Sequence, residues 1–355
     1  MKTIVLTGGG SSGHVTPNIA LLPGLKRAGY SIYYIGSRNG IEKQLIEKEG
    51  ISYHSINTGK LRRYFDLKNF TDAFRVADGF RQAFILLGQL KPSVVFSKGG
   101  FVSCPVVWAA WLRRIPVVIH ESDMTPGLTN RLSMPFAKAV CYTFPESKPH
   151  IPAIKGVRTG MPIREGLFGG SRSKGRSICG FVDTKPVIMV IGGSLGSEKV
   201  NGIVRSILDI LLKDFNICHI CGKGNVKPEL EGKPGYRQFE YISEEQPHIF
   251  ALSDLVVSRA GATVLFELLA LRKPNLLIPL SKAASRGDQI LNAASFEKQG
   301  YSMVLPEEKL DETYLVHAIQ ELYANGGKYR EAMKECAVDS GAAAVMKEIG
   351  KAVQK

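Results

Sequence analysis

The chain has 355 residues, of which 44% are hydrophobic and 22% are charged, and its 46 Lys and Arg against 32 Asp and Glu give a formal net charge of +14. A typical domain has about 150 residues, so the length favours two globular domains. The apolar runs are shorter than the roughly 18 residues of a membrane-spanning helix, and the segment before Gly8 is too short for a signal peptide, so we expect a cytoplasmic protein.

The positive charge favours a polyanionic partner such as a nucleic acid, an acidic lipid or a phosphorylated substrate. The motifs of nucleic-acid-binding modules are absent, so the charge alone does not choose among these partners.

Short apolar runs alternate with amphipathic stretches in the first half of the chain. The expected strands are Thr3 to Thr7, Ser31 to Ile35, Val94 to Phe96 and Val117 to Ile119. The expected helices are His14 to Ala28, Glu42 to Glu49 and Phe70 to Leu90. This alternation predicts a parallel sheet covered on both faces.

The alternation breaks between Lys155 and Lys185, in a stretch rich in Gly, Ser, Arg and Pro, and then begins again. The expected strands of the second half are Val187 to Ile191, Phe215 to Cys221, Leu255 to Val257 and Leu276 to Ile278. The expected helices are Val200 to Leu212, Val264 to Leu271 and an alanine-rich tail, Tyr329 to Val353. The sequence therefore predicts two α/β domains.

Each domain opens with a strand that runs into a glycine-rich loop, "GGGSSGH" at Gly8 to His14 and "GGSLG" at Gly192 to Gly196. Such loops free backbone N–H groups at a helix N-terminus, where the helix dipole favours anions. Ligands of open α/β sheets bind at the carboxyl ends of the strands. Two such domains facing each other would hold a phosphorylated ligand between them.

The first loop also satisfies the G-x-G-x-x-G pattern of dinucleotide-binding domains. An NAD enzyme needs an acid after the second strand, where this chain has Arg38, a residue that suits the 2′-phosphate of NADP. An NADP oxidoreductase has no role for the second glycine loop, however. Nor does it explain "SRAGATVLFE", in which Glu267 follows Gly261 in the early turns of a helix and could accept both ribose hydroxyls; alternatively, Glu267 merely complements the helix dipole.

The six cysteines include one C-x-x-C pair, Cys218 and Cys221, in a predicted strand. A zinc site needs four ligands, and a second pair at suitable spacing is missing. We expect reduced thiols beside a buried strand, and the sequence also lacks a D-x-D motif for a divalent metal.

Seven motifs then occur in order: "GGGSSGHVTPN", "SKGGFVSCPV", "HESDMTPGLTNR", "TGMPIR", "GGSLGS", "SRAGATVLFE" and "GDQILNA". In this order and spacing the chain resembles the MurG family of bacterial glycosyltransferases. The resemblance implies the GT-B fold, two Rossmann-like domains facing across a cleft. It also implies a hexosyltransferase that moves N-acetylglucosamine from UDP-N-acetylglucosamine to the C4 hydroxyl of the muramyl sugar of lipid I, giving lipid II for peptidoglycan.

Other readings remain open at this point. Another UDP-sugar-dependent transferase or a UDP-sugar epimerase would share the architecture. An NADP oxidoreductase and a basic nucleic-acid-binding protein are the weaker alternatives.

The resemblance implies an acceptor- and membrane-binding domain over residues 1–160 and a donor-binding domain over residues 161–334. The C-terminal helix, about residues 335–355, is expected to pack back on the first domain.

The resemblance assigns two sets of binding residues. The donor would be bound by Ser11, Ser12, Gly13, Asp123, Arg164, Ser194, Ile242, Ala262, Thr263, Glu267, Asp288, Gln289 and Asn292. The diphosphate of the lipid acceptor would be held by Gly9, Gly10, Gly13, Gly99 and Gly100. The chain departs from the family pattern at Ser12, which stands in place of glycine, at Asp123 in "HESD", and at Asp288, where glutamine is usual.

A single displacement at the anomeric carbon needs a general base and stabilisation of the departing diphosphate. His14 is the candidate base, with Glu121 and Asp123 as alternatives, because an imidazole suits proton transfer near neutral pH. Arg164, with backbone donors around Ser194 and Ala262, would offset the leaving-group charge, so we expect neither metal nor cofactor.

A lipid acceptor requires contact with the bilayer. Apolar residues flanked by cations suit an interface with anionic lipid, and the expected patch comprises Phe70, Phe74, Arg75, Trp111, Arg113 and Arg114. The protein is thus expected to be peripheral, at the cytoplasmic face of the cell membrane. Cell-wall and division proteins are further expected partners, and nucleic acid is not.

Overall fold

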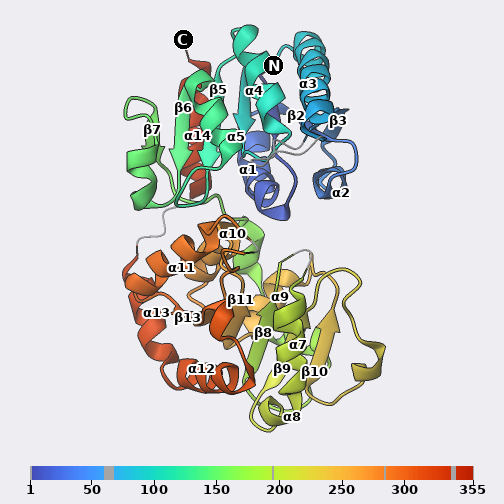
Figure 1. The fold of residues 1–355 in the computed structure, drawn as a ribbon, viewed down its shortest axis with the longest axis vertical. Helices are drawn as coiled ribbons and strands as arrows, with labels where there is room; N and C mark the ends of the chain where they lie inside the picture. Colours follow the sequence, from blue (N-terminus) through green and yellow to red (C-terminus); the bar gives the residue numbers. More distant parts are fainter. Residues whose placement is uncertain (1, 60–67, 194–195, 284, 337–340, 355) are drawn as a thin grey trace. The chain divides into compact units, whose positions relative to one another are not determined.

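The computed structural model describes residues 2–59, 68–193, 196–283, 285–336 and 341–354. The chain divides into two compact units, Met1–Arg164 together with Asp339–Lys355, and Glu165–Val338. From the sequence, the boundaries were predicted after residues 160 and 334. Each unit is built on one parallel sheet with helices on both faces (Figure 1).

The first unit has a seven-stranded sheet in the order β3-β2-β1-β4-β5-β6-β7. Its strands are β1 (Lys2–Thr7), β2 (Tyr30–Ser37), β3 (Ser52–Ile56), β4 (Val94–Ser97), β5 (Val117–Glu121), β6 (Ala139–Tyr142) and β7 (Gly156–Arg158). Successive side chains of a strand point to opposite faces, and both faces are apolar here: Ile4 and Leu6 join one buried cluster while Val5 joins the other. A sheet that is apolar on both faces must be covered by helices on both.

The helices of the first unit form two layers. One layer comprises α1 (Thr16–Arg27), α2 (Ile41–Lys48) and α14 (Gly341–Val353), and the other comprises α3 (Lys68–Leu90), α4 (Ser103–Leu112) and α5 (Leu128–Ser133). The last helix, α14, packs beside α1 and against β4, β5 and β6, although α13 before it belongs to the second unit (Figure 1). Lys138 Nζ donates to the carbonyl of Ala352 at 3.1 Å and holds the end of this helix.

The second unit has a six-stranded sheet in the order β10-β9-β8-β11-β12-β13. Its strands are β8 (Val187–Ile191), β9 (Asn216–Ile220), β10 (Tyr236–Phe239), β11 (Leu255–Ser258), β12 (Asn275–Leu277) and β13 (Met303–Val304). Its helices are α6 (Arg172–Cys179), α7 (Glu198–Ser206), α8 (Leu208–Leu211), α9 (Gln246–Leu252), α10 (Ala262–Ala270), α11 (Asp288–Lys298), α12 (Glu312–Ala324) and α13 (Gly326–Glu335). The C-x-x-C pair of this unit, Cys218 and Cys221, consists of buried free thiols, as the sequence predicted.

The two sheets share one strand order. In each unit the chain first extends the sheet to one side of its opening strand and then crosses back to the other side, so β1 lies beside β4 and β8 lies beside β11. The loops that follow such a pair of strands leave the sheet in opposite directions, and ligands bind at this point in open α/β sheets. The α/β class with two Rossmann-like domains, predicted from the sequence, is confirmed. Among the helices that the structure describes, none combines the length and the apolarity needed to cross a bilayer.

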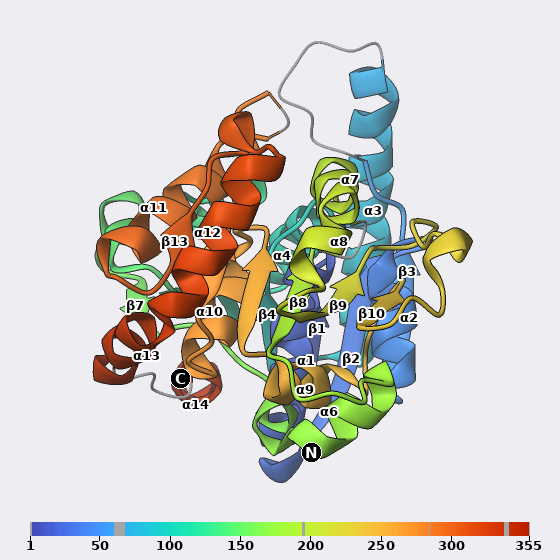
Figure 2. The ribbon, with the colours of Figure 1, turned by 90° about the horizontal axis from the view of Figure 1, so that it is seen from below.

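Several predicted elements differ from the structure. The alanine-rich tail, expected as one helix over Tyr329 to Val353, contains parts of two helices, α13 and α14. The helix expected from His14 begins at Thr16, because Ser12–His14 forms a separate 3-10 turn and Pro17 favours the first turn of the helix that follows. The helix expected over Val200 to Leu212 divides at Ile207 into α7 and α8 (Figure 2).

A further difference lies in the interrupted stretch between Lys155 and Lys185, which contains the strand β7 and the helix α6. The side chain of Ser171 caps α6 by accepting from Lys174 N at 3.3 Å. A Cβ at Gly175 would lie 2.3 Å from the carbonyl oxygen of His248, so this glycine allows α6 to pack closely on α9. Glycine here serves helix packing rather than chain flexibility.

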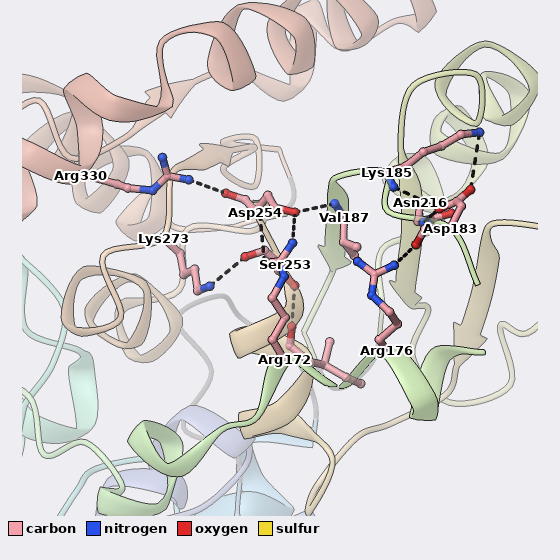
Figure 3. A network of polar contacts seen from close by, with 11 residues as sticks. Arg172, Arg176, Asp183, Lys185, Val187, Asn216, Ser253, Asp254, Lys273 and Arg330 are labelled. Carbon is pink, nitrogen blue, oxygen red and sulfur yellow. Dashed lines mark hydrogen bonds and ion pairs between the residues drawn. The ribbon is translucent and has the colours of Figure 1, made fainter. Parts of the chain in front are cut away.

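The elements of the second unit are joined at the amino ends of its strands by Asp254 (Figure 3). Its carboxylate accepts from both Nη atoms of Arg172, at 3.0 and 2.9 Å, and from the backbone of Val187 at 2.8 Å. Arg330 donates to its carbonyl at 3.4 Å, and the neighbouring Ser253 carbonyl accepts from Lys273 at 2.8 Å. One residue thus connects α6, β8, β11 and α13.

We expect Asp254→Ala to leave the amide of Val187 unpaired and to make local opening of β8 easier by about 1–2 kcal/mol, equivalent to about tenfold faster amide exchange. Hydrogen exchange of the peptide that contains β8, followed by mass spectrometry, measures this. Asp209→Ala is the control, because Asp209 pairs with Lys233 at 2.7 Å on the exposed surface and should leave exchange of β8 unchanged. Equal exchange of β8 in both variants would contradict the conclusion that Asp254 holds this strand.

Candidate active site

The loop after β1, residues 8–14, is held by residues of neighbouring elements. Tyr34 Oη donates to the carbonyl of Gly8 at 2.8 Å, and Asn18 Nδ2 donates to the carbonyl of His14 at 3.2 Å. The buried carboxylate of Glu42, on α2, accepts from the backbone of Gly10 at 3.3 Å. Glu42 was not among the residues predicted from the sequence, since it lies in a separate helix that only the fold brings to the loop.

The loop after β4 lies directly against the first loop. Gly99 and Gly100 have φ values of +92° and +83°, which side-chain-bearing residues rarely adopt. A Cβ at Gly100 would lie 2.0 Å from the carbonyl oxygen of Gly9. The structure therefore brings together the predicted acceptor-diphosphate glycines, Gly9, Gly10, Gly99 and Gly100, at the carboxyl ends of two adjacent strands.

His14, the candidate base, lies in the 3-10 turn Ser12–His14 and is partly buried. Its Nδ1 lies 3.1 Å from the carbonyl oxygen of Gly9 and 3.1 Å from Ser11 Oγ. With hydrogen on Nδ1, the ring donates to the Gly9 carbonyl, and Nε2 is then the basic nitrogen. The glycine loop thus orients the imidazole.

The carboxylate of Glu121, the last residue of β5, is buried and organises the loop that follows. Its Oε1 accepts from the backbone of Asp123 at 3.0 Å, and its Oε2 accepts from the backbone of Gly127 at 3.1 Å and from Asn130 Nδ2 at 2.9 Å. Burial and the nearby Asp123 raise the pKa of Glu121, against the opposing effect of Lys98. Asp123 itself is only partly buried. Of the two predicted carboxylates, Glu121 is engaged by its own loop, and Asp123 is the more accessible.

Lys98 is a residue of this site that the sequence analysis did not single out. Its side chain is only 1% exposed, and its Nζ donates to Ser122 Oγ at 2.9 Å. Burial lowers the pKa of Lys98, while Glu121 and Asp123 raise it. The sequence did carry a signal, because Lys98 is a charged residue directly after the buried strand β4 and directly before Gly99.

His120 precedes Glu121 and faces a different environment. Its Nε2 donates to the carbonyl of Gly160 at 2.9 Å, and burial together with the charge of Lys98 lowers its pKa to about 3. The ring is therefore neutral at physiological pH and holds the segment before Arg164.

The second unit repeats the arrangement after β8. Gly193 has a φ of +89°, and a Cβ at Gly196 would lie 1.9 Å from the carbonyl oxygen of Cys221, so only glycine fits. Ser197 caps α7 and accepts from Val200 N at 3.4 Å. Ser194, a predicted contact of the donor diphosphate, lies outside the described residues.

Arg259, which follows β11, joins three loops of the second unit and was also missed from the sequence. It donates to the carbonyl of Ile278 at 3.1 Å and to Ser197 Oγ at 2.6 Å, and it forms a buried ion pair with Glu307. Burial raises the pKa of Glu307, but its bonds to Arg259 and to the Ser281 amide outweigh this, so the net pKa is lowered. The ion pair fixes the loops around the start of α10.

The predicted donor residues of the second unit that the structure describes follow the carboxyl ends of strands β10, β11 and β12. Gly261 is the N-cap of α10, so Ala262 and Thr263 are its first two residues, whereas the sequence predicted that they precede the helix. Glu267 is buried in the second turn of α10. Ile242, also buried, follows β10.

The polar residues of α11 contact the same edge. Gln289 Oε1 accepts from the backbone of Leu280 at 3.1 Å, and the buried Asn292 donates to the carbonyl of Ala260 at 3.4 Å. Asp288, the first residue of α11, pairs with Arg286 at 3.3 Å. The other predicted donor residues belong to the first unit, namely Ser11, Ser12, Gly13, Asp123 and Arg164.

Comparison with solved structures defines the fold. Acinetobacter baumannii MurG matches over 99% of both chains with a TM-score of 0.74 and 24% sequence identity. The UDP-GlcNAc 2-epimerase from Neisseria meningitidis matches over 99% of this chain and 100% of its own with a TM-score of 0.71 and 14% identity. At these identities the likeness shows the fold alone, which is the two-domain architecture predicted as GT-B.

The family follows from the sequence models. The model of the glycosyltransferase family 28 N-terminal domain matches residues 4–142, and that of the C-terminal domain matches residues 187–349. The chain therefore belongs to glycosyltransferase family 28.

The related sequences carry the same name. The UDP-N-acetylglucosamine–N-acetylmuramyl-(pentapeptide) pyrophosphoryl-undecaprenol N-acetylglucosamine transferase of Clostridium tetani is 58% identical over 96% of this chain and 95% of its own length. The protein of the same name from Clostridium kluyveri is 60% identical over 95% of this chain and 96% of its own. The predicted resemblance to the MurG family is confirmed, and these relatives give no support to the oxidoreductase or nucleic-acid-binding alternatives.

We expect Gly100→Ala to displace the two glycine loops of the first unit and to lower the rate of sugar transfer by about 100-fold, because misplacement by about 1 Å has such an effect on catalysis. The clash of the new Cβ with the Gly9 carbonyl is the cause. Initial rates with saturating donor measure it.

Gly29→Ala is the matched control. Gly29 has a comparable φ of +74°, but a Cβ there would meet nothing within 4 Å. Its substitution should cost about 1 kcal/mol of backbone strain and leave the rate unchanged. Equal loss of activity in both variants would show that strain, and not loop contact, matters.

Proposed function

We propose that this protein transfers N-acetylglucosamine from UDP-N-acetylglucosamine to the C4 hydroxyl of the muramyl sugar of lipid I, with inversion, to give lipid II. The observation that carries the proposal is the 58–60% identity along almost the whole chain to transferases of this named activity. The epimerase alternative rests on fold alone, since the epimerase structure shares 14% identity.

The donor binds at the carboxyl edge of the sheet of the second unit. The start of α10 presents backbone N–H groups that suit a diphosphate. Glu267 binds the ribose hydroxyls, Ile242 contacts the uracil through its backbone, and Asp288, Gln289 and Asn292 meet the sugar. Thr263 and Ser194 contact the diphosphate. Arg259 lies three residues before the start of α10, and its three loop contacts hold that segment.

The acceptor diphosphate binds at the paired glycine loops of the first unit, in which Gly13 and Ser12 begin the 3-10 turn. His14 removes the proton of the acceptor hydroxyl as the sugar is transferred, and its anchored Nδ1 supports that role. Asp123 contacts the acceptor or the donor sugar, whereas Glu121 shapes the loop.

The departing UDP carries negative charge that must be offset. Arg164 and the N-terminus of α10 supply positive charge and hydrogen-bond donors for it. We therefore propose that the reaction needs no added metal or cofactor.

The lipid acceptor places the first unit at an anionic membrane surface. Exposed apolar side chains occur on three helices that pack together in this unit, namely Phe74 and Ile85 on α3, Trp111 and Leu112 on α4, and Leu132 on α5. Two exposed cations accompany them, Arg75 on α3 and Arg114 just after α4. The side chain of Phe70 lies outside the described residues. Arg113 stacks on the ring of Phe84, 3.8 Å from its centroid, so we assign it to support the patch from within.

The patch supports a peripheral protein at the cytoplasmic face of the cell membrane. Cell-wall and division proteins are the partners that this location offers.

Glu267→Gln should weaken UDP-N-acetylglucosamine binding by about 10- to 100-fold, because a charge-assisted hydrogen bond contributes about 1.5–3 kcal/mol. Calorimetric titration of the donor in the presence of EDTA measures this. UDP-glucose and NADPH are titrated separately as alternative ligands. Binding of NADPH alone would contradict the proposed function, and loss of donor binding with EDTA would contradict metal independence.

His14→Ala is the paired variant, with the opposite pattern. It should bind donor as the unaltered protein does and lower turnover of a lipid I analogue by about 100- to 10,000-fold, the usual contribution of a general base. Near-normal turnover would remove His14 as the base.

The double substitution Phe74→Ser with Trp111→Ser should weaken binding to vesicles that contain anionic lipid by at least about tenfold. Complete burial of one large apolar side chain contributes about 1.5–3 kcal/mol, and a tenfold change needs only about 1.4 kcal/mol. Sedimentation with anionic and with neutral vesicles measures it. Phe168→Ser with Val182→Ser, two exposed apolar residues of the second unit, is the control. Equal sedimentation of the unaltered protein with both vesicle types would contradict the electrostatic part of the proposal.

A further inference from the structure

Lys98 is among the largest fully buried side chains of the molecule. Its backbone N–H donates to the carbonyl of Thr7 at 2.9 Å, at the end of β1. A Cβ at Gly8 would lie 3.2 Å from the Cβ of Lys98, so the residue packs against the first glycine loop. Lys98 therefore lies beneath both glycine loops and extends toward the loop after β5.

A buried ammonium group is costly unless charge and hydrogen bonds compensate for it. Among the described residues, the groups whose charges act on Lys98 are Glu121 and Asp123, and the ring of His120 responds to Lys98 in turn. Filling space alone would need only an apolar side chain of similar length. The charge therefore indicates a role in the arrangement of these groups.

The backbone around Asp123 is held from two sides. Lys98 Nζ binds the side chain of Ser122, the residue before it, at 2.9 Å. Glu121 Oε1 accepts from the Asp123 amide itself at 3.0 Å. Glu121 Oε2 fixes the far end of the same loop through Gly127 and Asn130.

We propose that Lys98 is a positioning residue for sugar transfer: together with Glu121 it fixes the Ser122–Asp123 backbone, so that the carboxylate of Asp123 meets the reacting sugar in one orientation. The inference rests on the proposed function and adds a residue to it. Lys98 touches neither substrate; it acts through Ser122 and Asp123.

The proposal has a pH signature. Burial and Asp123 raise the pKa of Glu121, and the charge of Lys98 lowers it. Removal of that charge lets Glu121 take up a proton at a higher pH than before. A protonated Glu121 accepts hydrogen bonds less well, so the loop loosens and the acid side of the activity profile moves to higher pH.

The experiment measures kcat, the KM for each substrate and the pH profile of transfer for Lys98→Met and Ser122→Ala. Lys98→Met should lower kcat at least tenfold, leave the donor KM unchanged and move the acid limb up by about one pH unit or more, since a neighbouring opposite charge shifts a carboxyl pKa by about 1–3 units. Ser122→Ala keeps both charges, so it should lower kcat several-fold with the acid limb unmoved.

Lys273→Met is the matched control, because Lys273 also donates to one oxygen, the carbonyl of Ser253, but does so in the second unit. It should change neither kcat nor the acid limb. An unmoved acid limb in Lys98→Met, or a change confined to the donor KM, overturns the proposal. If Lys98→Met does not fold, Ser122→Ala decides, and unaltered kcat in that variant overturns it.

Hydrogen exchange of residues 121–127 separates this inference from the proposed function. Exchange there should be at least tenfold faster in Lys98→Met, whether or not sugar is transferred, and unchanged exchange overturns the inference. Absence of transfer by the unaltered protein, with lipid I analogue and donor supplied, overturns the proposed function instead.

Discussion

The close approach of two backbone loops at the carboxyl ends of adjacent strands is the constraint on which the rest of each unit depends. In the first unit, the carbonyl of Gly9 occupies the space where a side chain at Gly100 would lie. In the second, the carbonyl of Cys221 does the same for Gly196. Such contacts need glycine because no other residue lacks a Cβ.

In the first unit the strand order makes this approach possible, whereas in the second unit the loops that meet follow the consecutive strands β8 and β9. Because the chain returns to the opening strand before it extends the sheet to the other side, β1 has β4 as a neighbour and β8 has β11. Residues some 90 positions apart in the sequence therefore meet at the sheet edge, as Gly9 and Gly100 do in the first unit. The apolar faces of the strands and the two helix layers keep the sheet in place, and the loops at its edge hold the residues to which we assign the chemistry.

Both units contain buried charged side chains close to the segments to which we assign substrate binding. Lys98 with Glu121 in the first unit, and Arg259 with Glu307 in the second, lie directly behind the segments assigned to substrate. A buried pair adds little net stability, since desolvation offsets most of the attraction. Its value here is geometric. Lys98 and Glu121 both hold the loop after β5, and Arg259 and Glu307 hold the segments around Ile278 and Ser281. The same ions that stabilise the loops also set the ionisation of their neighbours, so that position and charge are coupled.

The sequence by itself determined a large part of this protein. Alternating apolar runs fixed the α/β class, glycine loops after the opening strands indicated phosphate, and seven ordered motifs indicated the family. These features are local or depend on order along the chain, so they can be recognised without coordinates. Several helix limits were wrong, as at Ile207 and His14, because backbone geometry and proline placement decide where a helix begins and ends.

Only the tertiary structure decided which residues act together. Glu42, Lys98, Asn130 and Arg259 were not predicted, because their partners lie on other elements and the sequence alone does not identify those partners. Only the structure shows that Glu121 and Asp123 differ, although they lie two residues apart at the end of β5. The oxygens of Glu121 accept hydrogen bonds from its own loop, whereas Asp123 is the more accessible. The physical reason is that hydrogen bonds and burial depend on distances across the fold, and the strand order sets those distances.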